Sequence, residues 1–198
     1  MPRDEAEAEF RKIKRFDARD MLCCTVELAR RYLAAHPKHG IVWLYYSDSL
    51  YAMARYTEAL AALRRGLPLC PPKKLHLVYY RFGQIHRERG AFRVAERWYR
   101  RAVEASPSDA TYHIFLGALL ARAGRLQEAE AVHRRATRCK EGCIDEAFLN
   151  LGLVLRALER YSDARKCFQR ALELDPKYKQ ARKALSDVEH VIEHIRNA

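Results

Sequence analysis

The stretch from Phe148 to Pro176, FLNLGLVLRALERYSDARKCFQRALELDP, decides how this chain folds. Large apolar residues recur three and four positions apart at Phe148, Leu151 and Leu155, which is the spacing of one face of an α-helix. A second helical pattern begins at Tyr161, and Pro176 ends it because proline cannot continue a helix. The stretch therefore predicts two helices joined by a short turn.

The same two-helix pattern returns about every 35 residues along the chain. A packing alanine marks the second helix of each copy, at Ala59, Ala95, Ala129 and Ala164. A large residue follows four positions later, at Leu63, Tyr99, His133 and Phe168. One slot of the first helix is always small, because a larger side chain would hold the paired helix too far away: Ser47, Gly83, Gly117 and Gly152. Units of this length stack on one another into a continuous core.

From Trp43 to Pro71, and in the corresponding segments through Pro176, the chain resembles the tetratricopeptide repeat family over residues 40–178. The resemblance implies an all-α fold, a right-handed α-solenoid of stacked antiparallel helix pairs. We expect one domain over residues 1–198, with clear repeats at 40–73, 76–109, 110–143 and 145–178. A degenerate repeat is expected at 6–39, and an amphipathic closing helix at 179–197.

The composition favours a protein that binds acidic partners. The 198 residues include 37 Lys and Arg against 25 Asp and Glu, which gives a formal net charge of +12. The N-terminus lacks the apolar region of a secretory signal, and no window approaches the 18 or so apolar residues of a membrane span. Six cysteines without a C-x-x-C pair fit reduced thiols. We therefore expect a cytoplasmic protein that does not enter a membrane.

Two groups of residues resemble metal or catalytic sites. One follows the H-x-x-E-H order of a class of zinc peptidases near the C-terminus: His190, Glu193 and His194. The other combines two thiols with an imidazole: Cys139, Cys143 and His133. Neither has the further ligands that a zinc site needs, so we interpret the first as a solvated helix end and the second as packing residues. Phosphate-binding loops and nucleophile motifs are absent from the sequence, which predicts no enzyme activity, metal or cofactor.

The resemblance also implies that the first helices line a concave groove. The residues expected there are mainly aromatic, basic and amide side chains: Tyr45, Asp48, Tyr51, Tyr80, Arg81, Gln84, Arg87, Phe115, Arg122, Asn150 and Arg156. Tyr and Arg are frequent anchors of protein interfaces, and Arg pairs well with carboxylates. The leading hypothesis is a non-enzymatic adaptor that captures an acidic segment of a protein partner in this groove.

Three alternatives remain open. The second helices carry arginine pairs in equivalent positions: Arg30-Arg31, Arg64-Arg65, Arg100-Arg101 and Arg134-Arg135. Such a ladder could follow a polyanion or nucleic acid, although charged outer helix faces are common in this family. The groove could instead shield a client protein, as in an export or assembly chaperone. The closing helix could also join copies of the chain into a homo-oligomer.

Overall fold

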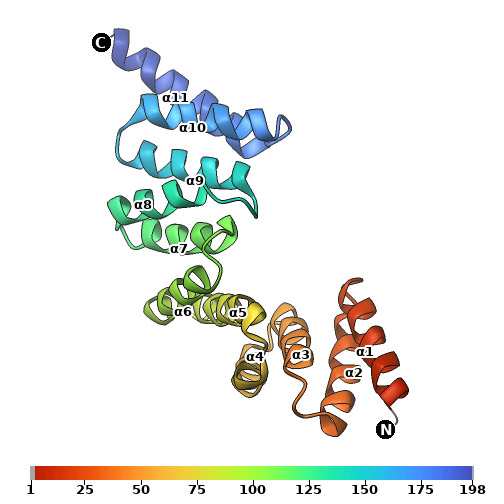
Figure 1. The fold of residues 1–198 in the computed structure, drawn as a ribbon. Coiled ribbons are helices and arrows are strands. Elements are labelled where there is room, and N and C mark those ends of the chain that lie inside the picture. Colours follow the sequence, from red (N-terminus) through yellow and green to blue (C-terminus); the bar gives the residue numbers. More distant parts are fainter. Residues whose placement is uncertain (1–2, 198) are drawn as a thin grey trace. The chain divides into compact units, whose positions relative to one another are not determined.

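The computed structural model describes residues 3–197, with side chains from residue 5 onward. Eleven α-helices follow one another, and the only β-type pairing in the described part is an isolated bridge between Asp109 and Glu141. This confirms the predicted all-α class. The helices are α1 Arg3–Asp17, α2 Leu22–Ala35, α3 Gly40–Ala52, α4 Tyr56–Gly66, α5 Leu75–Glu88, α6 Phe92–Ala105, α7 Ala110–Arg122, α8 Leu126–Ala136, α9 Ile144–Ala157, α10 Tyr161–Leu174 and α11 Lys179–Asn197 (Figure 1). Two short 3₁₀ turns, η1 Leu67–Leu69 and η2 Pro72–Lys74, connect α4 to α5.

The helices form two compact units, Met1–Ala105 and Ser106–Ala198, called unit 1 and unit 2 below. In unit 1, α1 packs on α2, α3 on α4 and α5 on α6, and the first helices α1, α3 and α5 contact one another in turn. In unit 2, α7 packs on α8 and α9 on α10, while α11 packs on α10. Each unit is thus a stack of helix pairs, as the repeats predict. The expected single domain over residues 1–198 stays a prediction.

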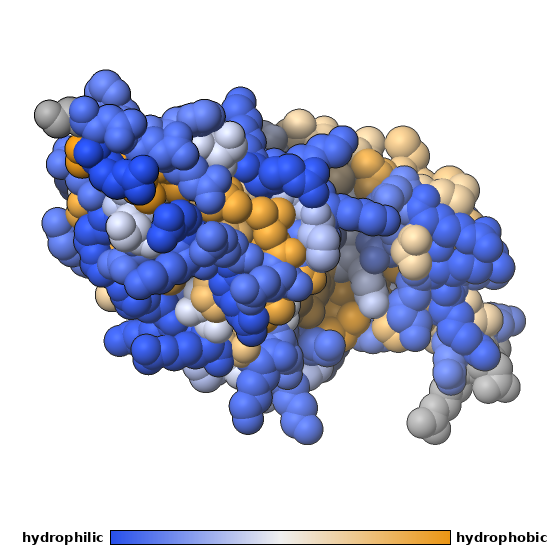
Figure 2. Space-filling model, turned by 90° about the horizontal axis from the view of Figure 1, so that it is seen from above, coloured by the Kyte–Doolittle hydropathy of each residue, from blue (hydrophilic) through white to orange (hydrophobic). Residues whose placement is uncertain are grey.

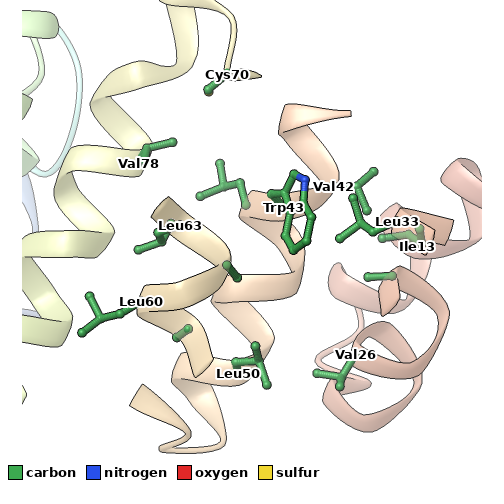
Figure 3. Close-up of a cluster of buried hydrophobic side chains, with 14 of the residues drawn as sticks. Ile13, Val26, Leu33, Val42, Trp43, Leu50, Leu60, Leu63, Cys70 and Val78 are labelled. Atoms are coloured by element: carbon green, nitrogen blue, oxygen red, sulfur yellow. The ribbon is translucent and has the colours of Figure 1, made fainter. Parts of the chain in front are cut away.

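The core of unit 1 draws side chains from five helices into one cluster (Figure 3). Ile13 of α1 and Val42 of α3 are fully buried in it, and Leu63 of α4 and Val78 of α5 are nearly so. Ile13 shows that the segment expected to hold a degenerate repeat contributes to the same core as the clear repeats. The first helices of unit 1 are therefore held in place by apolar packing on one side, which leaves their other side for a binding surface.

In α5, α7 and α9 a glycine lies against a ring of the paired second helix. A Cβ atom added at Gly83 would lie 2.4 Å from Cε1 of Tyr99, and one at Gly152 would lie 2.4 Å from Cε1 of Phe168. At Gly117 the added atom would lie 2.5 Å from Nε2 of His133. Both distances are far below van der Waals contact, so only glycine allows these helix pairs to approach so closely. This is the physical reason for the small slot that the sequence repeats.

Candidate functional site

Seven of the eleven predicted groove residues lie on α3 and α5, two neighbouring first helices of unit 1. Helix α3 carries Tyr45, Asp48 and Tyr51, and α5 carries Tyr80, Arg81, Gln84 and Arg87. Their spacing of three or four positions places the members of each set on one side of their helix. All seven are half-buried except Gln84, which is buried. We call these seven residues the α3–α5 surface.

A chain of hydrogen bonds connects the two helices across this surface. The Nε of Arg81 donates to Oδ1 of Asp48 at 2.5 Å, and the two side chains are 19% and 28% exposed. The Nη1 of Arg81 donates to Oε1 of Gln84 at 2.6 Å. The Nε2 of Gln84 in turn donates to the hydroxyl of Tyr80 at 2.7 Å. The charged pair is therefore part of a connected network, which holds each of its members in one orientation.

Aromatic rings complete the surface. The guanidinium of Arg81 lies 4.6 Å from the centroid of the Tyr51 ring, a cation–π contact that adds to the fixing of this arginine. Burial raises the pKa of Tyr80 to about 12, so its hydroxyl remains protonated at neutral pH. Burial also raises the pKa of Tyr45, with further contributions from Asp17 and Asp48. The ring of Tyr51 and the hydroxyl of Tyr80 thus belong to the same cluster as the fixed Arg81.

Asp17, at the end of α1, belongs to the electrostatics of this surface. Its pKa is raised mainly by its own burial and then by the nearby carboxylate of Asp48, while Arg81 acts in the opposite direction. Burial likewise raises the pKa of Asp48, and Arg81 opposes that shift. Asp17 was not among the predicted groove residues, because the first repeat departs from the common pattern and gives a weaker guide to groove positions. Two carboxylates therefore share the charge of one arginine here.

Arg81 keeps donors for a further group despite these contacts. A guanidinium has five N–H donors in a planar fork. The Nε and Nη1 atoms of Arg81 are used by Asp48 and Gln84, whereas its Nη2 has no hydrogen-bond partner among the described residues. Arg81 is thus oriented by its neighbours with one edge left for another acceptor.

The other three predicted arginines lie in different surroundings from one another. In unit 1, Nη2 of Arg87 pairs with Oε1 of its neighbour Glu88 at 2.6 Å. In unit 2, Arg156 of α9 pairs with Asp187 of α11, so this arginine ties the last helix to the stack. Arg122 is exposed at the end of α7. Basic side chains of the predicted groove are therefore largely balanced by acids within the chain.

The remaining residues predicted for the groove lie in unit 2. Phe115 on α7 and Asn150 on α9 are half-buried. The amide nitrogen of Asn150 donates to the backbone carbonyl of Glu146 at 2.9 Å, within its own helix. The hydrogen bonds and the cation–π contact described above join five residues of the α3–α5 surface into one cluster: Asp48, Tyr51, Tyr80, Arg81 and Gln84.

The arginine ladder of the second helices is interrupted by glutamates. Its members in three repeats pair with an acid three or four positions away in the same helix: Arg30 with Glu27, Arg134 with Glu130, and Arg100 with Glu96. Arg170 in the last repeat, which corresponds to the second arginine of each pair, pairs with Glu173. Part of the positive charge of the ladder is thus balanced within the chain, which weakens its attraction for phosphates. Hydrophilic side chains cover much of the face seen in Figure 2, with hydrophobic ones exposed between them.

The residues considered for metal or redox chemistry do not assemble a site. Within residues 5–197, no group of three His, Cys, Asp or Glu side chains lies close enough to hold a metal ion. His133 is buried in the core, and burial lowers its pKa to about 4. Burial raises the pKa of the Cys139 and Cys143 thiols, which keeps them protonated and weakly nucleophilic. In the described part of the chain, no helix has the length and apolar character of a membrane span.

Comparisons with known proteins identify the same repeats. A model of the Tetratricopeptide repeat matches residues 145–178, and a second model of that description matches residues 26–73 and 80–142. Tetratricopeptide repeat protein 7B of Homo sapiens is 32% identical over 158 residues, which cover 75% of this chain and 18% of that protein. The chain thus spans less than a fifth of the length of this relative.

A second relative carries an enzyme name, and a solved structure shares the fold. Protein O-mannosyl-transferase Tmtc1 of Drosophila melanogaster is 37% identical over 97 residues, which cover 47% of this chain and only 11% of that protein. The crystal structure of YrrB, described as a TPR protein with an unusual peptide-binding site, superposes with a TM-score of 0.66 at 18% identity. It covers 87% of each chain. At this level of identity the likeness shows the fold.

Proposed function

Because the chain belongs to the tetratricopeptide repeat family, we propose that it is a non-enzymatic protein-interaction module whose α3–α5 surface captures an acidic segment of a partner protein. The observation that carries this proposal is the orientation of Arg81 by Asp48 and Gln84, with Nη2 left for a partner. A donor that is already fixed loses little rotamer entropy on binding. The peptide-binding site named for YrrB, a protein of the same fold, supports a peptide as the ligand.

The surroundings of Arg81 explain how such a segment would be held. Tyr45, Tyr51 and Tyr80 offer large, half-buried rings, which are frequent interface anchors. Arg81 would donate through Nη2 to a carboxylate of the segment, while Asp48 keeps the guanidinium in place. The net charge of +12 would attract an acidic segment over a longer range and speed its association.

A peptide-display selection on the purified 198-residue chain tests this proposal. We expect the selected peptides to be enriched in Asp and Glu. Fluorescence anisotropy then gives the dissociation constant of one labelled peptide. The variant that combines Arg81→Gln with Asp48→Asn removes both charges and keeps side chains that can bond to each other. It should weaken peptide binding about tenfold or more, which corresponds to about 1.4 kcal/mol.

The control is Arg93→Gln, which removes one exposed cation of α6 outside this surface. It should leave the affinity within about twofold, since only the long-range attraction changes. Enrichment of Lys and Arg in the selected peptides would contradict the proposed acidic partner. An unchanged affinity of the double variant would show that the peptide does not bind at the α3–α5 surface.

A further inference from the structure

A second candidate binding site lies between α4, α5 and α6 of unit 1, helices that are neighbours in Figure 1. It is a cavity of about 580 Å³, lined by Arg64 of α4, His86 of α5 and, from α6, Arg97, Trp98, Arg101 and Glu104 among others. Positions 94, 97, 98, 101 and 104 of α6 follow helical spacing, so one face of this helix supplies most of the lining. We call this cavity the arginine pocket.

The arginine pocket holds an excess of positive charge. Neither Arg64 nor Arg97 forms an ion pair with any described residue, although they come from different helices and face the same cavity. Arg101 also lacks an ion pair among the described residues, and Glu104 is the acidic residue of the lining. Three guanidiniums therefore face one carboxylate. Because like charges repel, an anion in the cavity would lower the free energy of this arrangement.

One of these arginines is already positioned. The guanidinium of Arg101 lies 4.9 Å from the centroid of the Trp98 ring. Trp98 itself is stacked on Phe82, with ring centroids 4.4 Å apart and an interplanar angle of 14°. A guanidinium in a cation–π contact still has its N–H donors for an acceptor. Arg101 is thus prepared to donate into the pocket without losing much rotamer entropy.

The lining histidine does not add to the charge. His86 is half-buried, and burial is the largest cause of its lowered pKa. The nearby guanidiniums of Arg89, Arg64 and Arg97 lower it further. At neutral pH the imidazole is therefore uncharged and can donate or accept one hydrogen bond. The positive charge of the pocket comes from its arginines.

Arg64 differs from its counterparts in other repeats. The arginines at the equivalent second-helix position pair with glutamates there, as Arg30 does with Glu27 and Arg134 with Glu130. Arg100, which also lines the cavity, pairs with Glu96. An extended polyanion needs a continuous row of uncompensated cations, whereas a single compact dianion needs one cluster. The charge pattern thus favours one small, doubly charged group.

We propose that the arginine pocket binds the phosphate of a phosphorylated side chain in a partner protein. A phosphate monoester carries a charge near −2 at neutral pH and offers three strong acceptor oxygens. These oxygens match three guanidiniums that line one cavity better than the two oxygens of a carboxylate do. This site is distinct from the α3–α5 surface and goes beyond the function proposed for it.

The test measures binding of fluorescein-labelled nonapeptides by anisotropy, with the full chain at physiological salt. Each peptide is degenerate except at its centre, which is phosphoserine, phosphothreonine or phosphotyrosine in one set, and the unmodified residue or Glu in matched sets. We expect at least one phosphorylated set to bind about tenfold or more tightly than its unmodified and Glu counterparts, with the affinity falling steeply as salt rises. Equal binding of the phosphorylated and Glu sets would overturn the proposal.

Variants locate the binding. Arg64→Gln and Arg97→Gln should each weaken phosphopeptide binding about tenfold, because each removes one donor to the phosphate. Glu104→Gln should tighten it, since it removes the opposing carboxylate. Arg93→Gln, on the same helix but outside the pocket, should leave it unchanged. Circular dichroism melting shows which variants remain folded, and the four substituted residues are all exposed. An equal loss in Arg93→Gln would overturn the assignment to this pocket.

Two further probes separate the source of the phosphate and the two surfaces. Inorganic phosphate and inositol hexakisphosphate are added as competitors. If either binds as tightly as the best phosphopeptide, the pocket binds a free phosphate compound. The proposal that the phosphate belongs to a partner protein would then be wrong. The acidic peptide selected on the α3–α5 surface should bind Arg97→Gln as it binds the wild type, so failure of one site can be told from failure of the other.

Discussion

Arg81 of α5 donates to the carboxylate of Asp48 in α3 at 2.5 Å, across a sequence separation of 33 residues. The pair is mostly buried and joins two successive repeats. Removing the arginine alone leaves Asp48 without its counter-ion, which costs more than removing both charges. The same contact therefore contributes to the stability of unit 1 and to the orientation of its candidate binding donor.

A double-mutant cycle measures this contact. Arg81→Gln should lower the free energy of unfolding by about 1–3 kcal/mol, and adding Asp48→Asn should restore part of the loss. We expect a coupling energy of about 1 kcal/mol from urea denaturation of the four proteins. Additive effects of the two substitutions would show that the pair is not formed in solution.

His133 should make the protein sensitive to acid. Its pKa is about 4 in the folded chain, chiefly because of burial and secondarily because of His113, whereas an unfolded histidine titrates near 6.5. The unfolded state binds the proton first, so stability is lost as the pH falls from about 6.5 towards 4 and changes no further below that. Between pH 7 and 4.5 this single group should cost about 2.5 kcal/mol.

The last repeat shows which residue can replace this histidine. Phe168 occupies the equivalent position in the last repeat and lies against Gly152 as His133 lies against Gly117. His133→Phe should therefore fold and should lose about 2.5 kcal/mol less than the wild type between pH 7 and 4.5, measured by urea denaturation at both values. Parallel losses in the two proteins would contradict the low pKa.

Much of the fold could be predicted from the sequence, because the small slots and packing alanines are fixed by helix contact alone. Ala59, Ala95, Ala129 and Ala164 are all fully buried, and Gly83, Gly117 and Gly152 lie against rings of the paired helices. Spacing also placed the predicted residues of α3 and α5 on neighbouring helices. It could not show that Arg81 pairs with Asp48, since ion pairing depends on side-chain rotamers and on the distance between repeats. The sequence could not predict the arginine pocket either, because Arg64 and Arg97 are 33 positions apart and come together only through the packing of successive repeats.

One turn between paired helices can be made more stable by a substitution. Gly90 and Gly124 have φ angles of 74° and 76°, and Glu159 adopts a φ of 58° at the same place in the last repeat. A left-handed conformation costs a residue with a Cβ roughly 1 kcal/mol. Glu159→Gly should therefore raise the free energy of unfolding by about 0.5–1 kcal/mol and raise the melting temperature. The matched change Gly124→Ala should lower both, and the same direction of change in the two variants would contradict this explanation.

The contact between Gly152 and Phe168 should tolerate no extra atom. A methyl group at position 152 would lie 2.4 Å from the ring, so Gly152→Ala must push α9 away from α10. We expect a loss of about 2 kcal/mol in the free energy of unfolding. Combining it with Phe168→Leu should recover part of the loss, because the shorter side chain leaves room. Equal stability of Gly152→Ala and the wild type would show that the helices are not packed this closely.

Photo-crosslinking of a display-selected acidic peptide tests the central claim most directly. Benzoylphenylalanine replaces Tyr45 on the α3–α5 surface in one protein and Arg93 on α6 in the other, and mass spectrometry identifies the crosslinked peptide after irradiation. The account predicts crosslinks from position 45 that disappear when unlabelled peptide is added in excess, and none from position 93. Crosslinks from position 93 with none from position 45 would show that acidic segments bind elsewhere on the chain.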